Sequence, residues 1–258
     1  MTKLASWNVN SVKARLGHVL DWLKAAQPDI VCLQELKCAE VDFPRLEIKS
    51  LGYDAVVAGQ KTYNGVAILS RTPATDVVAA LPGDGKDEQA RYIEATIGDL
   101  RVASVYLPNG NPAPGDKFDY KLAWMKRLRA HAQNLLDQEL SFALAGDFNV
   151  APNDDDVYDP AAWKDDALCR PESRTQFRAL LNLGVVDSFR TLHAESHRYT
   201  YWDYMQRRFE TDHGLRIDHI LLSPQATDRL RECDIDKAPR SRDKPSDHTP
   251  IWCDLAAP

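Results

Sequence analysis

The feature that most constrains this chain is a short apolar run that ends in a carboxylate and an amide. Residues 142–145 read FALA and are followed by Gly146, Asp147, Phe148 and Asn149. A continuous apolar run of this length is typical of a strand that is covered on both faces. Side chains two apart on a strand share a face, so Asp147 and Asn149 are expected together at the strand's exit, where they suit a metal-dependent hydrolytic site. The competing interpretation is a turn, because Gly, Asp and Asn are also the commonest turn residues.

Length and composition are those of a chain that can build its own hydrophobic core. The 258 residues are 44% hydrophobic and contain no internal repeat, low-complexity linker or composition break, so we expect one domain over residues 1–258. The five cysteines form no CxxC pair, which disfavours a disulfide framework and a thiolate zinc site. Strand-like sequence begins within three residues of Met1, and no apolar run approaches membrane-spanning length. We therefore expect a cytoplasmic protein with no membrane partner.

The formal net charge of −6 argues only weakly against a nucleic-acid partner. Acidic residues gathered around a metal would contribute to that total, while a basic surface could still occupy one face.

Apolar periodicity predicts more strands than helices. We expect helices after Ser11 as N-cap, over about 118–138 and over 174–183. Two stretches, 108–116 and 152–171, are expected to be loops, and loops as long as the second are more often functional than accidental. The short strands of the first half are separated by turn signals, which favours antiparallel pairing. The predicted strands are 4–10, 29–35, 52–57, 65–70, 91–97, 101–106, a short stretch near 199, 216–222 and 249–255.

Several predicted strands carry residues capable of chemistry. Asp218 lies inside the apolar run 215–222, where a carboxylate is costly unless it has a partner. His248 is the natural partner, because an imidazole that acts on a phosphate needs its other nitrogen held. Glu35 and Asp247 are then free to hold a hard divalent cation through oxygen.

Each of these residues also has a purely structural interpretation. Asn8 is placed to cap the following helix, Glu35 to end a strand at the surface, and His248 to be a hydrogen-bonded structural histidine. Asp218 would then form a structural ion pair, and Tyr106 would be a strand aromatic.

Six motifs in this sequence resemble, in order and spacing, those of the exonuclease III family of the endonuclease/exonuclease/phosphatase superfamily. The likeness covers essentially the whole chain. It implies an α/β four-layer sandwich, in which two mixed β-sheets pack face to face and are flanked by helices. The motifs are SWNVN at 6–10, LQE at 33–35, YLPNG at 106–110, GDFN at 146–149, GLRID at 214–218 and PSDH at 245–248.

The resemblance also implies roles for individual residues. Asp147 would activate water or protonate the leaving oxygen, Asn149 would donate to the phosphorane, and Tyr106 would orient the phosphate. His248, held by Asp218, would bind or polarise the phosphate, with general-base action less well defined. The implied site for magnesium, or for manganese, comprises Asn8, Glu35, Asp147, Asn149 and Asp247.

The resemblance suggests where a substrate would bind. Tyr201 and Trp202 resemble an aromatic pair that accepts a base-free sugar, although relatives commonly have Trp or Phe where Tyr201 stands. Core packing is the alternative role for both rings. The candidate phosphate contacts are Lys61, Arg91, Arg170 and Arg174, each of which could equally be a solvated charge.

The resulting expectation is a monomeric DNA-repair phosphodiesterase. It would incise duplex DNA 5′ to abasic sites and act on 3′ ends as a 3′-to-5′ exonuclease. The alternatives are a superfamily member that acts on RNA, inositol phosphates or sphingolipid, and a DNA-binding module without catalysis. The intact set of Glu35, Asp147, Asn149, Asp218 and His248 disfavours the second alternative.

Overall fold

Two six-stranded mixed sheets form the centre of the molecule in the computed structural model, which describes residues 1–257. The strand order of the first sheet is β11-β12-β1-β2-β4-β3, and that of the second is β5-β6-β7-β8-β10-β9. The bounds in the first sheet are β1 (Thr2–Asn8), β2 (Ile30–Gln34), β3 (Asp54–Ala58), β4 (Val66–Ser70), β11 (Leu230–Ile235) and β12 (Ile251–Leu255). Those in the second are β5 (Ala74–Val78), β6 (Tyr92–Ile97), β7 (Leu100–Tyr106), β8 (Phe142–Asp147), β9 (Val186–Asp187) and β10 (Asp218–Leu222).

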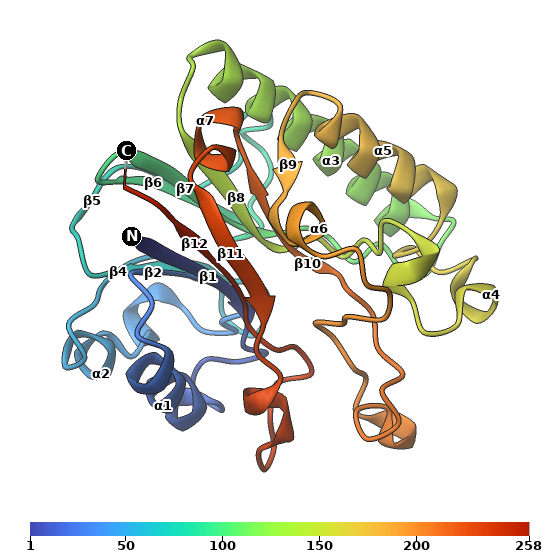
Figure 1. Ribbon diagram of the computed structural model, residues 1–258, viewed down its shortest axis with the longest axis horizontal. Coiled ribbons are helices and arrows are strands. Elements are labelled where there is room, and N and C mark those ends of the chain that lie inside the picture. The colour runs from blue at the N-terminus through green and yellow to red at the C-terminus, as the bar shows by residue number, and fades with distance from the viewer. Residues whose placement is uncertain (258) are drawn as a thin grey trace.

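Helices cover the outer faces of both sheets, which gives the predicted four layers (Figure 1). The first sheet is covered by α1 (Leu16–Ala26) and α2 (Arg45–Lys49), and the second by α3 (Asp116–Asp137) and α5 (Pro171–Leu181). The remaining short helices are α4 (Pro160–Trp163), α6 (Ser188–Leu192) and α7 (Pro224–Thr227), with 3-10 turns η1 (Glu40–Asp42), η2 (Asp154–Asp156), η3 (Met205–Arg207) and η4 (Ala238–Ser241).

Strand alternation divides the buried side chains into separate layers. In β1, Leu4 belongs to the cluster between the sheets, whereas Ala5 and Trp7 pack outward toward α1. A second outer cluster joins β7 and β8 to α3 and α5. Buried apolar area of this extent is the main favourable term for folding. Among the described residues no helix is long and apolar enough to cross a membrane.

The predicted strands and helices are largely confirmed, with five corrections. Ser11 does not cap a helix, because its φ of 87° is left-handed and α1 begins only at Leu16. The strand expected from residue 216 begins at Asp218, and the stretch near residue 199 contains isolated bridges at Tyr201 instead of a strand. Antiparallel pairing holds for β2–β4, β3–β4 and β6–β7, whereas β1–β2 and β7–β8 are parallel. Finally, β5 and β11 were not predicted, because their side chains are mostly exposed or only partly buried.

Candidate active site

The ends of strands from both sheets meet at one edge of the sandwich. In the second sheet Asp147 is paired in register with Tyr106 on one side and with Asp218 on the other. In the first sheet Asn8 is the last residue of β1 and Glu35 directly follows β2. The pairing therefore brings residues that are far apart in sequence to a common edge.

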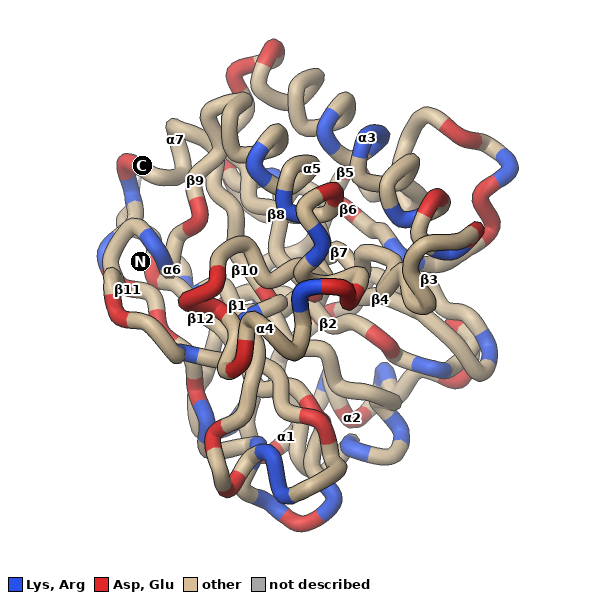
Figure 2. Tube along the Cα trace, turned by 90° about the vertical axis from the view of Figure 1, so that its right-hand side faces the viewer, with Lys and Arg blue, Asp and Glu red and all other residues tan. Residues whose placement is uncertain are grey.

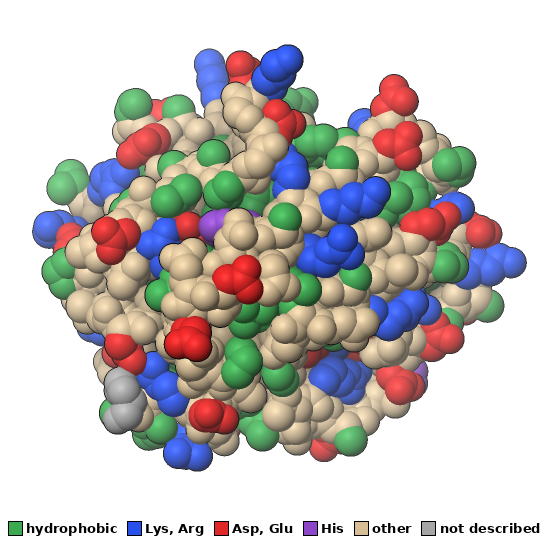
Figure 3. Space-filling model, turned by 90° about the horizontal axis from the view of Figure 1, so that it is seen from above, with side chains coloured by type: hydrophobic (Ala, Val, Ile, Leu, Met, Phe, Trp, Pro, Cys, Tyr) green, Lys and Arg blue, Asp and Glu red, His purple; other side chains and the backbone are tan. Residues whose placement is uncertain are grey.

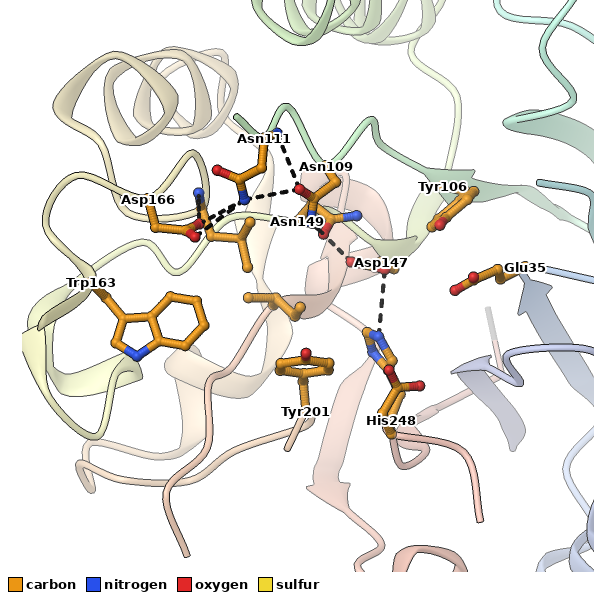
Figure 4. Close-up of a pocket in the computed structure, with 13 residues that line it drawn as sticks. Glu35, Tyr106, Asn109, Asn111, Asp147, Asn149, Trp163, Asp166, Tyr201 and His248 are labelled. Carbon is orange, nitrogen blue, oxygen red and sulfur yellow. Dashed lines mark hydrogen bonds and ion pairs between the residues drawn. The ribbon is translucent and has the colours of Figure 1, made fainter. Parts of the chain in front are cut away.

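These strand ends open into a cavity of 340 Å³. Figure 4 shows Glu35, Tyr106, Asp147 and His248 directed toward a shared space, with Tyr201 and Trp163 on its other side. Its lining residues are Glu35, Tyr106, Asn109, Asn111, Asp147, Asn149, Trp163, Asp166, Leu168, Tyr201, Ile217, Asp247 and His248.

Both carboxylate oxygens of Asp147 are held by hydrogen bonds. Its Oδ1 accepts a hydrogen bond from the backbone N–H of Asn149 at 2.9 Å, and its Oδ2 accepts one from Nδ2 of Asn8 at 3.0 Å. Burial raises the pKa of Asp147 to about 7, although the nearby His248 opposes that change. A carboxyl group that titrates near neutrality can accept and return a proton during turnover.

His248 lies between two buried carboxylates. Its Nδ1 is 2.8 Å from Oδ2 of Asp218, and its Nε2 is 3.7 Å from Oδ2 of Asp147. Burial alone would lower the pKa of His248, but Asp218 and Asp147 together raise it to about 10. The two carboxylates therefore favour the protonated imidazolium, which donates hydrogen bonds and positive charge.

A second group of polar residues surrounds Glu35. Oε2 of Glu35 accepts a hydrogen bond from Nδ2 of Asn8 at 3.0 Å, and Oε1 forms an ion pair with Nζ of Lys37 at 2.9 Å. Lys37 also donates to Oδ1 of Asn10 at 2.6 Å, and Nδ2 of Asn10 donates to Oδ1 of Asp247 at 2.9 Å. Glu35, Lys37 and Asn10 all have positive φ, at 57°, 53° and 44°. Such backbone strain in non-glycine residues gathers at functional sites.

The donor chemistry of the cavity fits a divalent metal ion. Glu35, Asp147 and Asp247 are carboxylates that line the cavity, and hard divalent cations prefer oxygen ligands. Asp147, Asp218 and His248 also offer ligand atoms that lie within 4.8 Å of one another, although the His248–Asp218 contact already occupies two of these groups. Asn8 is 1% exposed and does not line the cavity, and its amide instead fixes Glu35 and Asp147.

Tyr106 and Asn149 line the cavity beside Asp147. Burial and the charge of Glu35 raise the pKa of Tyr106, so its phenol stays protonated and can donate. Asn149 donates from Nδ2 to the carbonyl of Leu107 at 2.9 Å, and its Oδ1 accepts from Nδ2 of Asn109 at 3.1 Å. One amide hydrogen of Asn149 remains for another acceptor.

The expected aromatic wall requires one correction. Tyr201 lines the cavity, but Trp202 is 0% exposed and does not. The Trp202 indole packs edge-on against Tyr199 and Phe209, and its Nε1 donates to Asp212 at 3.0 Å. Neighbouring residues of an extended segment face opposite ways, so only one of the two rings can reach the cavity. The apolar lining is Tyr201 together with Trp163, Leu168 and Ile217.

The four candidate phosphate contacts are not among the lining residues of the cavity. Lys61 is exposed, while Arg91 lies over the Tyr106 ring at 4.8 Å. Arg170 is 3.4 Å from Glu172, and Arg174 pairs with Asp154 at 2.7 Å. Basic and acidic residues alternate along the chain trace in Figure 2, and both signs are interspersed on the face seen in Figure 3.

Two buried cations that support the site were not predicted. Lys121 is 0% exposed, and its Nζ donates to the carbonyls of Asn109, Asn149 and Ala167 at 3.0, 2.6 and 3.1 Å. Burial lowers its pKa to about 7. The available signal was its place on the apolar stripe of the predicted helix, three residues after Phe118 and four before Met125.

The second buried cation is Arg216, which is also 0% exposed. It binds Asp156 and Asp187, each at 2.8 Å, and so attaches the segment 152–171 to the strand that carries Asp218. The signal for Arg216 was its position in the same apolar run as Asp218.

A two-sheet sandwich with a carboxylate, imidazole and amide set at one edge defines a hydrolase of phosphate esters, because these groups neutralise and protonate a phosphorane. The chain belongs to the Endonuclease/Exonuclease/phosphatase family, whose sequence profile matches residues 5–248.

Named relatives confirm the resemblance to the exonuclease III family. The chain is 33% identical over 265 residues to Exodeoxyribonuclease III of Haemophilus influenzae, covering 98% of this chain and 99% of the relative. An AP endonuclease from Archaeoglobus fulgidus superposes with a TM-score of 0.96 at 37% identity, covering 100% of both chains. The 3′ phosphatase NExo from Neisseria, bound to a product DNA hairpin, gives a TM-score of 0.97 at 40% identity, again covering 100% of both chains.

Proposed function

We propose that this protein is a DNA-repair phosphodiesterase that incises duplex DNA 5′ to abasic sites and removes nucleotides or blocking groups from 3′ ends. The observation that carries the proposal is the joining of two features in one cavity. The Asp147–His248 pair lies on one side, and the apolar wall of Tyr201, Leu168 and Ile217 lies on the other. A polar catalytic edge beside an apolar recess suits a phosphodiester whose neighbouring sugar lacks a base.

The residues of the chain divide the reaction between them. Asp147 accepts a proton from the attacking water or returns one to the leaving oxygen, in keeping with its pKa near 7. His248, as an imidazolium, donates from Nε2 to a phosphate oxygen while Asp218 fixes the ring. Asn149 and Tyr106 donate to the oxygens on which charge develops. The reaction leaves a 3′ hydroxyl.

The proposed cofactor is Mg²⁺, with Mn²⁺ as a substitute. Glu35, Asp147 and Asp247 would hold it, with Asn149 at the edge of the set and Asn8 orienting two of the carboxylates. When bound, the ion supplies positive charge that offsets the negative charge of the pentacovalent phosphate.

We further propose that residues 1–258 act as one domain and as a monomer. The cluster between the sheets joins residues from Leu4 to Leu255, which supports a single domain. A cytoplasmic location is also proposed, because all five cysteines are buried free thiols, as is usual in a reducing compartment.

The testing experiment uses three substrates with and without Mg²⁺: a duplex with one abasic site, an undamaged duplex with a recessed 3′ end, and a single-stranded RNA of the same length. The proposal expects metal-dependent incision 5′ to the abasic site and metal-dependent release of nucleotides from the 3′ end. Faster cleavage of RNA, or no incision of the abasic duplex, would contradict it. Asp147→Asn should lower turnover by at least about a hundredfold and keep duplex binding, which separates catalysis from a binding module.

DNA binding should also weaken steeply with salt despite the acidic total charge, because phosphate contacts release counterions. A flat salt response would count against a duplex partner.

A further inference from the structure

The inner faces of the two sheets change from apolar to polar just below the active site. In β2, Ile30 and Cys32 belong to the cluster between the sheets, and Gln34 follows them on the same face. In β7, Val102 belongs to that cluster, and Ser104 follows it on the same face. Gln34 and Ser104 are both 0% exposed. The last inward layer before the active site is therefore polar, although it is as deeply buried as the apolar core.

Hydrogen bonds in this layer join one sheet to the other. Nε2 of Gln34 donates to Oγ of Ser104 at 3.1 Å, and that hydroxyl donates in turn to the backbone carbonyl of Leu33 at 3.0 Å. Within its own sheet, Gln34 meets Oγ of Ser6, which lies 3.1 Å from Nε2 and 3.3 Å from Oε1. We name the three side chains of Ser6, Gln34 and Ser104 the polar layer.

The polar layer lies directly behind site residues that come from different sheets. Glu35 follows Gln34 in the chain, and Tyr106 lies two residues after Ser104 on the same face of β7. Figure 4 shows Glu35 on the blue ribbon of the first sheet and Tyr106 on the green ribbon of the second, and both line the cavity. The distance between these two side chains therefore depends on how one sheet is placed against the other.

A second connection between the sheets runs inside the site itself. Nδ2 of Asn8 donates to Glu35 and to Asp147, which belong to different sheets, at 3.0 Å in each case. Asn8 lies two residues after Ser6 on the same face of β1. The Asn8 amide and the polar layer thus hold the sheets together at two successive levels.

Apolar packing alone does not give the precision that catalysis needs. The burial of apolar area is non-directional, whereas a hydrogen bond weakens steeply outside a narrow range of distance and angle. A misplacement of about 1 Å can cost about a hundredfold in rate. Apolar side chains at positions 34 and 104 would fill the space without the cost of burying an amide and a hydroxyl. The polar pair at these positions is therefore explained by accurate placement of the sheets.

We propose that Gln34 and Ser104 are positioning residues that set the distance between Glu35 and Tyr106. They would thereby align the side of the site that binds the cation with the side that orients the phosphate. This inference rests on the proposed function, since it assumes that both sides act on one phosphate. Gln34 and Ser104 are buried below the cavity and are not among its lining residues. Their loss should therefore lower turnover and metal affinity and leave substrate binding largely intact.

The test compares the triple variant Ser6→Ala/Gln34→Met/Ser104→Ala with Ser223→Ala. The triple variant removes the whole polar layer at once, so none of its side chains is left without a partner, and methionine keeps much of the volume of glutamine. Ser223 provides a matched control. It is also 0% exposed and accepts a hydrogen bond from the backbone N–H of Phe142 at 3.0 Å, but it lies at the opposite end of β8 from the site.

The kinetic constants are measured on an abasic duplex and on bis(4-nitrophenyl) phosphate, at a temperature where circular dichroism shows every variant folded. The triple variant should lower kcat at least about tenfold on both substrates, with KM nearly unchanged. Ser223→Ala should keep the wild-type kcat although its Tm falls. Gln34→Met and Ser104→Ala should each cause most of the loss, and their combination should add little, because they act through a shared hydrogen bond.

A metal titration gives a readout that does not depend on turnover. Mg²⁺ should raise the Tm of wild type and of Ser223→Ala by equal amounts, and that of the triple variant by less at the same concentration, since the stabilisation follows affinity. The inference is overturned if the triple variant keeps the wild-type kcat or the full Mg²⁺ shift, or if Ser223→Ala loses as much kcat. If wild type does not incise the abasic duplex, the proposed function has failed, and hydrolysis of the small diester still decides the role of Gln34 and Ser104.

Discussion

Nδ1 of His248 lies 2.8 Å from Oδ2 of Asp218, so the imidazole is fixed by a carboxylate that does not itself line the cavity. The same ring has Asp147 on its other side at 3.7 Å, and the two carboxylates raise its pKa to about 10. We infer that proton transfer belongs to Asp147 and that His248 acts as a charged donor.

Asp218→Asn should lower kcat by roughly 10- to 100-fold and leave KM for an abasic duplex nearly unchanged, because Asp218 orients His248 without lining the cavity. Steady-state kinetics on the duplex provides the measurement. An unchanged kcat would show that the His248 ring is held adequately without this carboxylate.

Trp163→Ala and Trp202→Ala should have different effects. Trp163 lines the cavity, so its loss should reduce kcat/KM for abasic incision roughly tenfold or more and spare a small diester. Trp202 is fully buried, so Trp202→Ala should instead lower the free energy of unfolding by about 3–5 kcal/mol. Urea unfolding and kinetics on both substrates test this. If Trp163→Ala slows both substrates equally, the assignment of the apolar wall is wrong.

Glu94 should contribute to stability in a defined pH range. Burial would raise its pKa, but hydrogen bonds from His131, Arg101 and Tyr92 lower it to about 2, against an ordinary value of 4.5. A lowered pKa means that the native state binds fewer protons, so this stabilisation is present above pH 4.5 and is lost as pH falls toward 2. Glu94→Gln should cost about 3 kcal/mol at pH 7 and almost nothing near pH 2.

Urea unfolding of wild type, Glu94→Gln and the exposed Glu88→Gln across this pH range provides the test. A Glu94→Gln deficit that stays constant down to pH 2 would show that the effect is packing and not ionisation.

Lys121→Met should lower the free energy of unfolding by about 3–5 kcal/mol, because it leaves three buried carbonyls without a donor. Lys126→Met, on an exposed position of the same helix, should stay within about 0.5 kcal/mol of wild type. Since two of the three carbonyls belong to Asn109 and Asn149, kcat should also fall at temperatures where the variant is folded. If Lys121→Met and Lys126→Met are equally stable, water must bind the three carbonyls in place of the Lys121 ammonium group.

The strand ends could be predicted because their signal is local. The apolar runs before Glu35 and Asp147 are continuous in sequence, and each ends at the residue that enters the cavity. The fold followed mainly from the resemblance, since periodicity alone does not pair β7 with β8. The faces of Tyr201 and Trp202 could not be predicted, because that segment is not a strand of either sheet and Tyr201 forms only isolated bridges, to Leu215 and His248.

The supporting cations were harder to predict for a different reason. Lys121 finds its acceptors on three separate loops, and Arg216 finds Asp156 sixty residues away in sequence. A charged residue on an apolar stripe indicates that partners exist, but only the folded chain identifies them.

The pairing of β1 with β12 has a consequence for how the protein is made. Thr2 lies opposite Leu255, so β1 pairs with β12. During synthesis β1 can pair with β2 early, but its other neighbour, β12, is the last strand to leave the ribosome. Asp247 and His248 are translated just before β12, and both are needed for the proposed chemistry. A nascent chain that has not yet reached these residues therefore carries Glu35 and Asp147 without the complete proposed site.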